Sequence, residues 1–191
     1  MHTVVVVDDE PITRMDVTGM LLELGYDVVG EAADGFDAVS LCQAKHPDVV
    51  LMDVNMPIFD GLTASDIIIT ENLAGCVVLL TAFNDDEIID KASKIGVTGY
   101  LVKPVEQRRI KPAIEVALAQ SEKLRTSKKE TEKAQKQLED SRLVARAQAI
   151  IAKKEKCTES EAYAMLRSMA MDKRVSMAVL AKAVLNQEAK Q

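Results

Sequence analysis

The fold is decided by residues 49–57, which read Val49-Val50-Leu51-Met52-Asp53-Val54-Asn55-Met56-Pro57. The four apolar residues at the start of this stretch, two of them β-branched, are typical of a short buried strand. Asn55 and Pro57 do not continue such a strand, so the chain is expected to turn away after it. The stretch therefore predicts a strand that carries one carboxylate, that of Asp53, at its carboxyl end.

Four further short apolar segments, at 3–7, 26–33, 76–80 and 99–102, alternate with helical patterns. This alternation predicts an α/β domain whose parallel sheet is covered by helices on both faces. In such sheets, ligands bind beyond the carboxyl ends of the strands. Polar side chains follow three of these segments in the sequence, and they are Asp8, Asp9, Thr81 and Lys103.

Three carboxylates at one edge of a sheet repel one another, and a cation among them would relieve the repulsion. Oxygen ligands with room for water favour Mg²⁺. We expect Asp9 and Asp53 to be direct ligands, Asp8 to act largely through water, and the Asn55 carbonyl to complete the set. The alternative, that these acids are merely solvated at strand ends, leaves their matched positions unexplained.

The cation would lower the cost of bringing a phosphoryl group to Asp53, which could then act as a nucleophile and form an acyl phosphate. Lys103 could pair with the new phosphoryl oxygens, and the Thr81 hydroxyl could hydrogen-bond to one of them. The edge of the sheet therefore predicts a phosphorylation site rather than a simple metal site.

Charge is divided unevenly along the 191 residues, whose net charge is −6. Residues 1–120 carry 8 Lys/Arg against 20 Asp/Glu, whereas residues 143–191 carry 9 against 5. An acidic front suits a cation site, and a basic tail suits a polyanionic partner. No apolar run reaches the length of a membrane span and no basic stretch precedes the first apolar run, so we expect a cytoplasmic protein without membrane contact.

Beyond about residue 110 the strand pattern ends, and no glycine follows Gly99. Residues 113 to about 154 contain no helix breaker and predict one long helix. Pro112 just before them is tolerated if it lies in the first turn, where a missing N–H costs nothing. Its heptad seam over 113–142 offers only Leu124 and Leu138 as large apolar contacts, so a coiled coil there should be marginal. This segment is either a plain linker or a seam weak enough for a distant event to close.

Two short helices complete the prediction. A capping box at residues 158–161 opens the first, and Ser176 is expected to cap the second. The residues expected to face the core are Ala162, Met165, Leu166 and Met169 in the first helix, and Val179, Leu180, Ala183 and Val184 in the second. Together with the end of the long helix they form a three-helix output module that is too small to be very stable alone.

Residues 1–120 resemble the receiver domain of two-component response regulators. The resemblance rests on Val7-Asp8-Asp9-Glu10, Met52-Asp53-Val54-Asn55-Met56-Pro57 with Gly61, Thr81-Ala82, and Tyr100-Leu101-Val102-Lys103-Pro104. It implies a flavodoxin-like sheet of order 2-1-3-4-5, Mg²⁺, a sensor histidine kinase as phosphodonor, and a cis bond before Pro104. It also implies a switch in which Thr81 moves toward the phosphoryl group and Tyr100 turns inward.

Residues 143–191 resemble the ANTAR module, an RNA-binding antiterminator domain found behind receiver domains. The resemblance rests on the blocks Ala147-Gln148-Ala149-Ile150-Ile151, Glu159-Ser160-Glu161-Ala162-Tyr163-Ala164-Met165-Leu166-Arg167, Ala170-Met171-Asp172 and Val179-Leu180-Ala181. Gln148 stands where the family usually has lysine, which replaces a phosphate contact by a side chain able to read a base edge. Among regulators with this layout, the chain resembles those that control ethanolamine utilisation.

The output is predicted to bind RNA rather than DNA. The last helix offers only Lys182 and Asn186 beside Ser176 as groups able to reach base edges, which makes a poor DNA-reading helix. Basic residues instead gather around the helix junctions, and Tyr163 could stack on an unpaired base. The predicted RNA contacts are Gln148, Lys153, Lys154, Tyr163, Arg167, Lys173 and Arg174.

These observations predict a regulator and not an enzyme, because the tail lacks a Gly-rich phosphate loop and a catalytic triad. Phosphorylation of Asp53 is expected to form a homodimer that binds tandem stem-loops in mRNA leaders and prevents transcription termination. The alternative is a phosphorylation-driven dimeriser whose helical tail binds DNA or protein. Salt dependence of binding would separate a nucleic-acid partner from a protein partner.

Overall fold

The computed structural model describes residues 1–82 and 86–188. Its chain forms two compact units, Met1–Arg125 and Thr126–Gln191, which are called here the first and second units. Within the described ranges, no helix has the length and apolar character that crossing a membrane requires.

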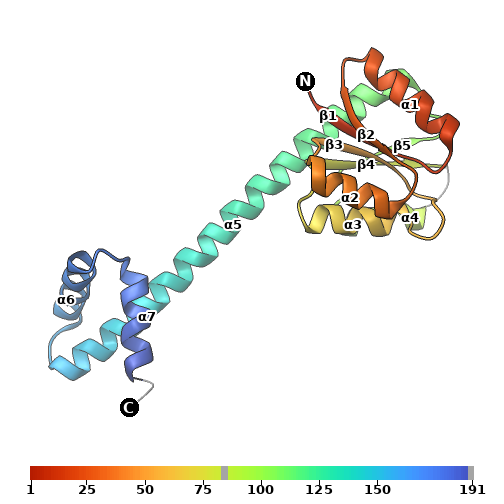
Figure 1. Ribbon diagram of the computed structural model, residues 1–191. Coiled ribbons are helices and arrows are strands. Elements are labelled where there is room, and N and C mark those ends of the chain that lie inside the picture. The colour runs from red at the N-terminus through yellow and green to blue at the C-terminus, as the bar shows by residue number, and fades with distance from the viewer. Residues whose placement is uncertain (83–85, 189–191) are drawn as a thin grey trace. The chain divides into compact units, whose positions relative to one another are not determined.

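The first unit is built around a five-stranded parallel sheet of order β2-β1-β3-β4-β5, which confirms the predicted topology. Helices connect successive strands (Figure 1). The helical pattern of residues 85–95 predicts a start at Asp85, which lies outside the described residues. The elements are β1 (Thr3–Val7), α1 (Pro11–Glu23), β2 (Asp27–Ala32), α2 (Gly35–Lys45), β3 (Val49–Asp53), α3 (Gly61–Thr70), β4 (Cys76–Thr81), α4 (Asp86–Ile95) and β5 (Gly99–Val102).

Side chains that alternate along the central strands build two separate cores. Val4 and Val6 of β1 pack with Leu21 of α1 and with the first turns of α5 (Gln107–Glu155). Val5 and Val7 point to the other face and pack with α2, α3 and α4. Because both faces of the sheet are covered, the strands read as continuous apolar runs, and polar side chains are left for their ends.

The long helix α5 spans Gln107–Glu155 and therefore begins six residues before the predicted start. Pro112 lies in its second turn, where it removes one backbone hydrogen bond, and not in the first turn, where its missing N–H would cost nothing. The physical reason is burial: Ile110 and Ile114 flank the proline and are both fully buried against the sheet. Their packing offsets the lost bond.

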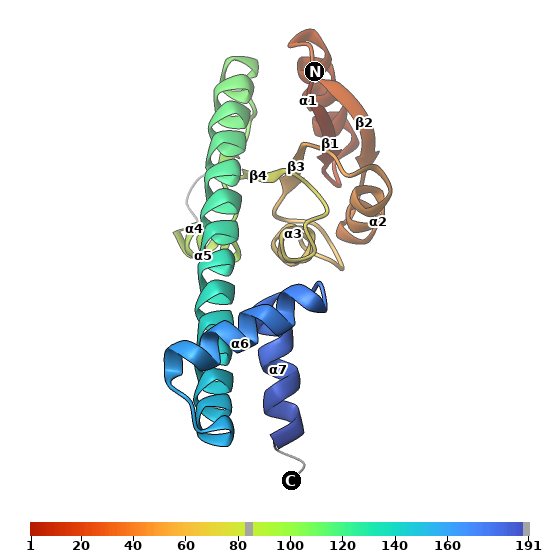
Figure 2. The ribbon, with the colours of Figure 1, turned by 90° about the vertical axis from the view of Figure 1, so that its left-hand side faces the viewer.

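In the second unit, the end of α5 packs with α6 (Glu159–Asp172) and α7 (Met177–Glu188) (Figure 2). The capping box at Thr158 is present, and the Ser176 hydroxyl caps α7 by accepting the Val179 N–H at 3.3 Å. The core is small and consists of Ala147, Leu166, Ala170, Leu180 and Ala181, with partly buried neighbours.

Of the eight predicted core residues of this unit, Ala162, Leu166 and Leu180 are buried and Val184 is partly buried, whereas the other four are exposed. Met165, Met169 and Val179 retain 42%, 40% and 59% of their accessible surface, and Ala183 is also exposed. In α6 the buried stripe is Ala162, Leu166 and Ala170, so one narrow row of side chains fills the space between three thin helices. Helical periodicity indicates a broad apolar side but cannot select which row a small core uses.

Candidate functional site

Three carboxylates meet at the carboxyl edge of the first unit's sheet. Asp8 follows β1, Asp53 is the last residue of β3, and Asp9 lies in the loop that leads to α1. One oxygen from each of the three lies within 4.8 Å of the others. Asp8 is fully buried and Asp53 is 4% exposed, whereas Asp9 is exposed. The predicted acidic site therefore exists, with two acids held inside the domain and one facing solvent.

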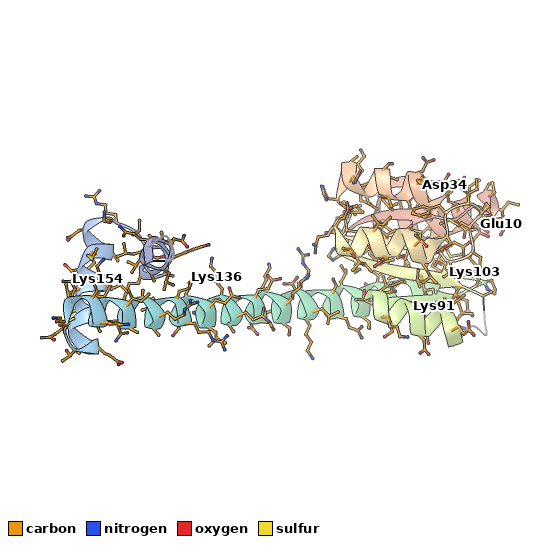
Figure 3. The ribbon with its side chains drawn as sticks, turned by 90° about the horizontal axis from the view of Figure 1, so that it is seen from below. Glu10, Asp34, Lys91, Lys103, Lys136 and Lys154 are labelled. Atoms are coloured by element: carbon orange, nitrogen blue, oxygen red, sulfur yellow. The ribbon has the colours of Figure 1, made fainter. Side chains whose placement is uncertain are left out.

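Lys103, just after β5, joins two of these acids. Its Nζ lies 2.7 Å from Asp8 Oδ2 and 2.9 Å from Asp53 Oδ1. Burial alone would lower the pKa of Lys103, but hydrogen bonds and the charges of the two carboxylates raise it above its usual value. The amine is therefore cationic at neutral pH. The following peptide bond to Pro104 is cis, as the resemblance implied, and Lys103 lies at the same end of the unit as Glu10 (Figure 3).

The charge of Asp53 is incompletely compensated. Burial raises its pKa above the usual value, and the negative charge of Asp8 raises it further. Lys103 and the Asn55 backbone N–H act in the opposite direction but do not cancel the effect. A positive ligand at this edge would remove that penalty.

The residues fit a hard divalent cation. All donors at the edge are oxygens, which is the ligand type that Mg²⁺ prefers. Within the described part of the chain, the buried Oδ2 of Asp8 has the Lys103 amine, 2.7 Å away, as its one polar contact, so part of its capacity to accept hydrogen bonds is unused. Asn55 is exposed and follows Asp53 by two residues, which fits the predicted role of its carbonyl as a further oxygen ligand. An incompletely satisfied buried carboxylate among other oxygens is the donor set expected at such a site.

The turn after Asp53 is fixed by Gly61, the first residue of α3. The Gly61 N–H donates to the Val54 carbonyl at 3.0 Å, and a Cβ at position 61 would lie only 1.8 Å from the Asp53 carbonyl oxygen. Asp60 caps the same helix by accepting the Thr63 N–H at 2.8 Å. The backbone of Asp53 thus packs directly on Gly61. The sequence motif includes this glycine, but the motif alone does not explain why a glycine is needed there.

Thr81 and Tyr100 line one pocket of the first unit. Thr81 is buried at the end of β4, and its hydroxyl donates to the Ala82 carbonyl at 3.1 Å. Tyr100 is 55% exposed. Both line a pocket of about 180 Å³, together with Ile88 and Ala92 of α4. The Thr81 hydroxyl and the outward-facing ring of Tyr100 therefore border the same pocket.

The predicted RNA contacts in the second unit are surface groups, with one exception. Tyr163 is 43% exposed, and the exposed basic residues are Lys153, Lys154, Arg167, Lys173 and Arg174. The side chain of Gln148 is engaged within the fold, because its amide donates to the Glu159 carbonyl at 2.9 Å. Its amide nitrogen links α5 to the start of α6.

The predicted seam of α5 is open to solvent. Every residue from 122 to 139 is exposed, and Leu124 and Leu138 retain 58% and 54% of their surface. A helix without tertiary packing over this length is only marginally stable in water.

Sequence reasoning missed Arg14, one turn into α1. Its Nη1 donates to the Asp8 carbonyl, 2.6 Å away, and its Nε to Glu31 Oε2, 3.2 Å away. Only its place, one helical turn after the acidic loop, could have signalled this role, because a lone arginine on a helix normally indicates a solvated surface.

Comparison with known proteins matches these two parts of the chain to two families. Residues 4–115 match the model of the response regulator receiver domain, and residues 132–185 match the model of the ANTAR domain. Among solved structures, the chemotaxis protein CheY4 of Vibrio cholerae is 30% identical, with a TM-score of 0.58 over 62% of this chain and 99% of that one. The receiver domain of a sensor histidine kinase from Pseudomonas aeruginosa PAO1 is 25% identical, with a TM-score of 0.55 over 62% of this chain and 98% of that one, and it holds a magnesium ion in its active-site cleft.

One curated relative extends over nearly the whole chain. The transcriptional regulatory protein PdtaR of Mycobacterium tuberculosis is 38% identical over 182 residues, which are 95% of this chain and 88% of that protein. The nitrate/nitrite regulator NarL of Escherichia coli is 34% identical over 119 residues, which are 61% of this chain and 55% of NarL. The acidic edge, the two family models and the full-length relative agree, and the chain therefore belongs to the response regulators that carry a receiver domain followed by an ANTAR domain.

Proposed function

We propose that Asp53 accepts a phosphoryl group from a sensor histidine kinase, and that the modified protein binds RNA hairpins as a homodimer and so prevents transcription termination. The observation that carries the proposal is the acidic edge: three carboxylate oxygens within 4.8 Å, with one amine bridging Asp8 and Asp53, on the same chain as an ANTAR domain.

Asp8, Asp9 and Asp53, with the Asn55 carbonyl, would hold Mg²⁺. When bound, the ion supplies positive charge that offsets both the carboxylates and an incoming phosphoryl group. A carboxylate oxygen of Asp53 then attacks the phosphorus of a phosphohistidine. As the P–O bond forms, the P–N bond breaks and its electron pair returns to the kinase's imidazole. Lys103 already lies at hydrogen-bond distance from Asp53 and would pair with the new phosphoryl oxygens.

The signal would leave the site through Thr81 and Tyr100. A phosphoryl oxygen on Asp53 offers the Thr81 hydroxyl a charged acceptor in place of the Ala82 carbonyl. Movement of Thr81 toward the phosphoryl group would enlarge the pocket that it shares with Tyr100 and admit the exposed ring. Such a rearrangement changes the surface formed by α4 and β5.

That surface change would allow two receivers to pair and two α5 helices to zip. The seam positions between Ala117 and Gln148 contain no charged residue, although charges crowd the rest of this stretch. Leu124 and Leu138 are the large apolar side chains of the seam, and both are exposed in the single chain. A seam of this composition is weak, so its closure would depend on receiver pairing.

We place the RNA-binding surface on one exposed row of α6. Tyr163, Arg167 and Met171 are spaced four residues apart and therefore share one side of the helix, next to the buried row of Leu166. An aromatic ring and a guanidinium can stack on and hydrogen-bond to unpaired bases. Basic groups stand at both ends of this row, with Lys153 and Lys154 before α6 and Lys173 and Arg174 after it. They would neutralise backbone phosphates.

A protein-binding output is the second candidate, and the exposed Met165, Met169 and Val179 favour it. The two candidates respond differently to salt. Affinity for a hairpin should fall by roughly 0.7–0.9 log units per neutralised phosphate for each log unit of salt, whereas an apolar protein contact should change little.

The deciding experiment combines beryllofluoride, a phosphoryl mimic, with sedimentation and hairpin binding. The wild-type chain should become dimeric at micromolar concentration and bind a tandem hairpin RNA more tightly through avidity. The Asp53→Asn variant should remain monomeric, whereas Asp66→Asn, an exposed acid of α3, should behave as wild type. A beryllofluoride-bound wild type that remains monomeric and binds RNA no better would refute the proposal.

A further inference from the structure

The loop between β1 and α1 carries two of the three acids, and its backbone is held at three points. The Asp8 N–H donates to the Ala32 carbonyl at 3.2 Å, which extends the β1–β2 ladder by one bond. The Glu10 N–H donates to Asp8 Oδ1 at 2.9 Å. Between these two bonds lies the Asp8–Asp9 peptide, whose carbonyl accepts a hydrogen bond from Nη1 of Arg14 at 2.6 Å.

Arg14 is itself fixed from two elements. Its Nε donates to Glu31 Oε2 at 3.2 Å, and Thr18 Oγ1 donates to Glu31 Oε1 at 3.2 Å. Arg14 and Thr18 are four residues apart on α1, so both face Glu31 at the end of β2. Only 19% of the arginine side chain is exposed. The guanidinium thus spans from a carboxylate on β2 to a carbonyl in the acidic loop.

The charge of Arg14 argues against a direct electrostatic benefit to a metal. A cation next to the three acids would by itself weaken the binding of another cation. Glu31 lies within ion-pair distance and offsets most of that charge. What remains is the hydrogen bond to the Asp8 carbonyl, which fixes the plane of the peptide that leads into Asp9.

Asp9 is the acid that depends most on this peptide. Unlike Asp8 and Asp53 it is exposed, so no surrounding core fixes its carboxylate. The direction of its side chain follows from its backbone, and the backbone plane is set by the carbonyl that Arg14 holds.

We propose that Arg14, clamped by Glu31 and Thr18, is a positioning residue that orients Asp9 toward Asp53 for a divalent cation. The inference rests on the proposed Mg²⁺ site. Arg14 would not touch the ion. It would nevertheless contribute to the affinity for the ion, as outer-shell hydrogen bonds at metal sites commonly do.

The test measures Mg²⁺ binding to the full chain by isothermal titration, without phosphodonor, beside thermal unfolding. Arg14→Met removes the donor and the charge and should weaken Mg²⁺ binding by about tenfold. Arg14→Lys keeps one donor and should recover part of the loss. Arg108 is an exposed arginine of α5 that pairs with Glu106. Arg108→Met is therefore the matched control and should bind Mg²⁺ as wild type does.

The direction of the change in Mg²⁺ affinity distinguishes an effect of the charge of Arg14 from an effect of its hydrogen bond to the Asp8 carbonyl. If Arg14 acted only through its charge, Arg14→Met would bind Mg²⁺ more tightly, and that result, or unchanged binding, overturns the proposal. Thr18→Val leaves the charge unaltered but loosens the clamp, so it should weaken binding by about twofold. It also keeps the test decisive if Arg14→Met does not fold, because wild-type binding by both Thr18→Val and Arg14→Lys would then refute the role.

Failure of the proposed function has a different signature. A wild-type chain that binds no Mg²⁺ at millimolar concentration refutes the magnesium site, and the positioning role falls with it. A wild type that binds Mg²⁺ beside an Arg14→Met variant that binds equally well refutes the positioning role alone.

Discussion

The functional groups of the two units lie in opposite environments. The first unit contains the receiver domain and is called here the receiver, and the second contains the ANTAR domain and is called the ANTAR unit. In the receiver, Asp8, Asp53 and Thr81 are buried, and Lys103 is held between two carboxylates. In the ANTAR unit, the basic groups and Tyr163 lie on the surface of a small core. A buried site is organised before its ligand arrives, whereas an exposed set of long side chains becomes ordered only when a partner binds. Changes in the receiver should therefore act through packing, and changes in the ANTAR unit through binding.

The largest effect is expected at the glycine beneath Asp53. Gly61→Ala places a Cβ 1.8 Å from the Asp53 carbonyl oxygen, so the β3–α3 turn must shift. We expect a loss of about 3 kcal/mol in the free energy of unfolding, together with slow phosphorylation of Asp53. Denaturant unfolding and intact-mass measurement after treatment with a small phosphodonor report the two effects.

Gly19→Ala is the matched control, because it makes the same substitution inside α1, where the new Cβ would meet no atom within 4 Å apart from its own neighbours and the nearby backbone of the helix. It should stabilise the protein by up to about 1 kcal/mol, since alanine favours a helix over glycine. Equal behaviour of the two variants would show that the packing beneath Asp53 does not matter.

The next effect belongs to the exposed seam. Leu138→Lys should weaken dimer formation of the beryllofluoride-bound chain by at least tenfold, because two charges would face each other in the seam. Phosphorylation of Asp53 should be unchanged. Lys136→Ala, outside the seam, serves as the comparison, and sedimentation equilibrium measures both. A dimer of unaltered affinity in Leu138→Lys would place the contact elsewhere.

A smaller effect concerns the buried charge of Asp53 without Mg²⁺. Its pKa is raised in the folded chain, so the folded state binds a proton more readily than the unfolded state. Stability then falls as pH rises through the interval between the usual and the raised pKa, and the cost is complete above it. Asp53→Asn should therefore stabilise the protein at pH 7 by on the order of 1 kcal/mol.

The gain should disappear as pH falls below the usual aspartate pKa, where Asp53 is neutral in both states. Mg²⁺ should also diminish it, because the ion stabilises only the charged wild type. Thermal melts across pH, with exposed Asp66→Asn as the control, measure the difference. A variant less stable than wild type at pH 7 would show that Lys103 fully compensates the charge.

The smallest effect is expected in the ANTAR unit. Thr158→Ala removes the hydroxyl that accepts the Glu161 N–H at 3.3 Å, and with it half of the capping box. The expected loss is about 0.5–1 kcal/mol, confined to the melting of this unit. Backbone hydrogen exchange in α6 should report it, and a change in the exchange of β3 or β4 would contradict the separation of the two units.

The same contrast explains how much the sequence could predict. The acidic edge was predictable because each buried strand forms a continuous apolar run, and the polar residue that ends it must lie at the sheet's edge. The buried Leu166 was predictable as well, but the exposure of Met165 beside it was not, because both are apolar and only the positions of neighbouring helices decide between them. The start of α5 differs from the prediction because a proline normally marks a helix boundary, whereas here the buried Ile110 precedes it within the helix.

Arg14 was unpredictable for a related reason. Its importance lies in a bond to a backbone carbonyl, and the sequence contains no side chain that signals the acceptor. The domain limits of 1–120 and 143–191 and the likeness to ethanolamine regulators stay predictions.

The exposed stretch of α5 has a consequence for how the protein is digested. Residues 122–139 are all exposed, so little packing opposes local opening there. Six lysines and arginines lie among them, namely Lys123, Arg125, Lys128, Lys129, Lys133 and Lys136. Trypsin should therefore cut here before it cuts either unit, and release receiver and ANTAR fragments. A closed seam would protect the same peptide bonds. The rate of tryptic cleavage within residues 122–139 is therefore a direct measure of how often two chains are joined.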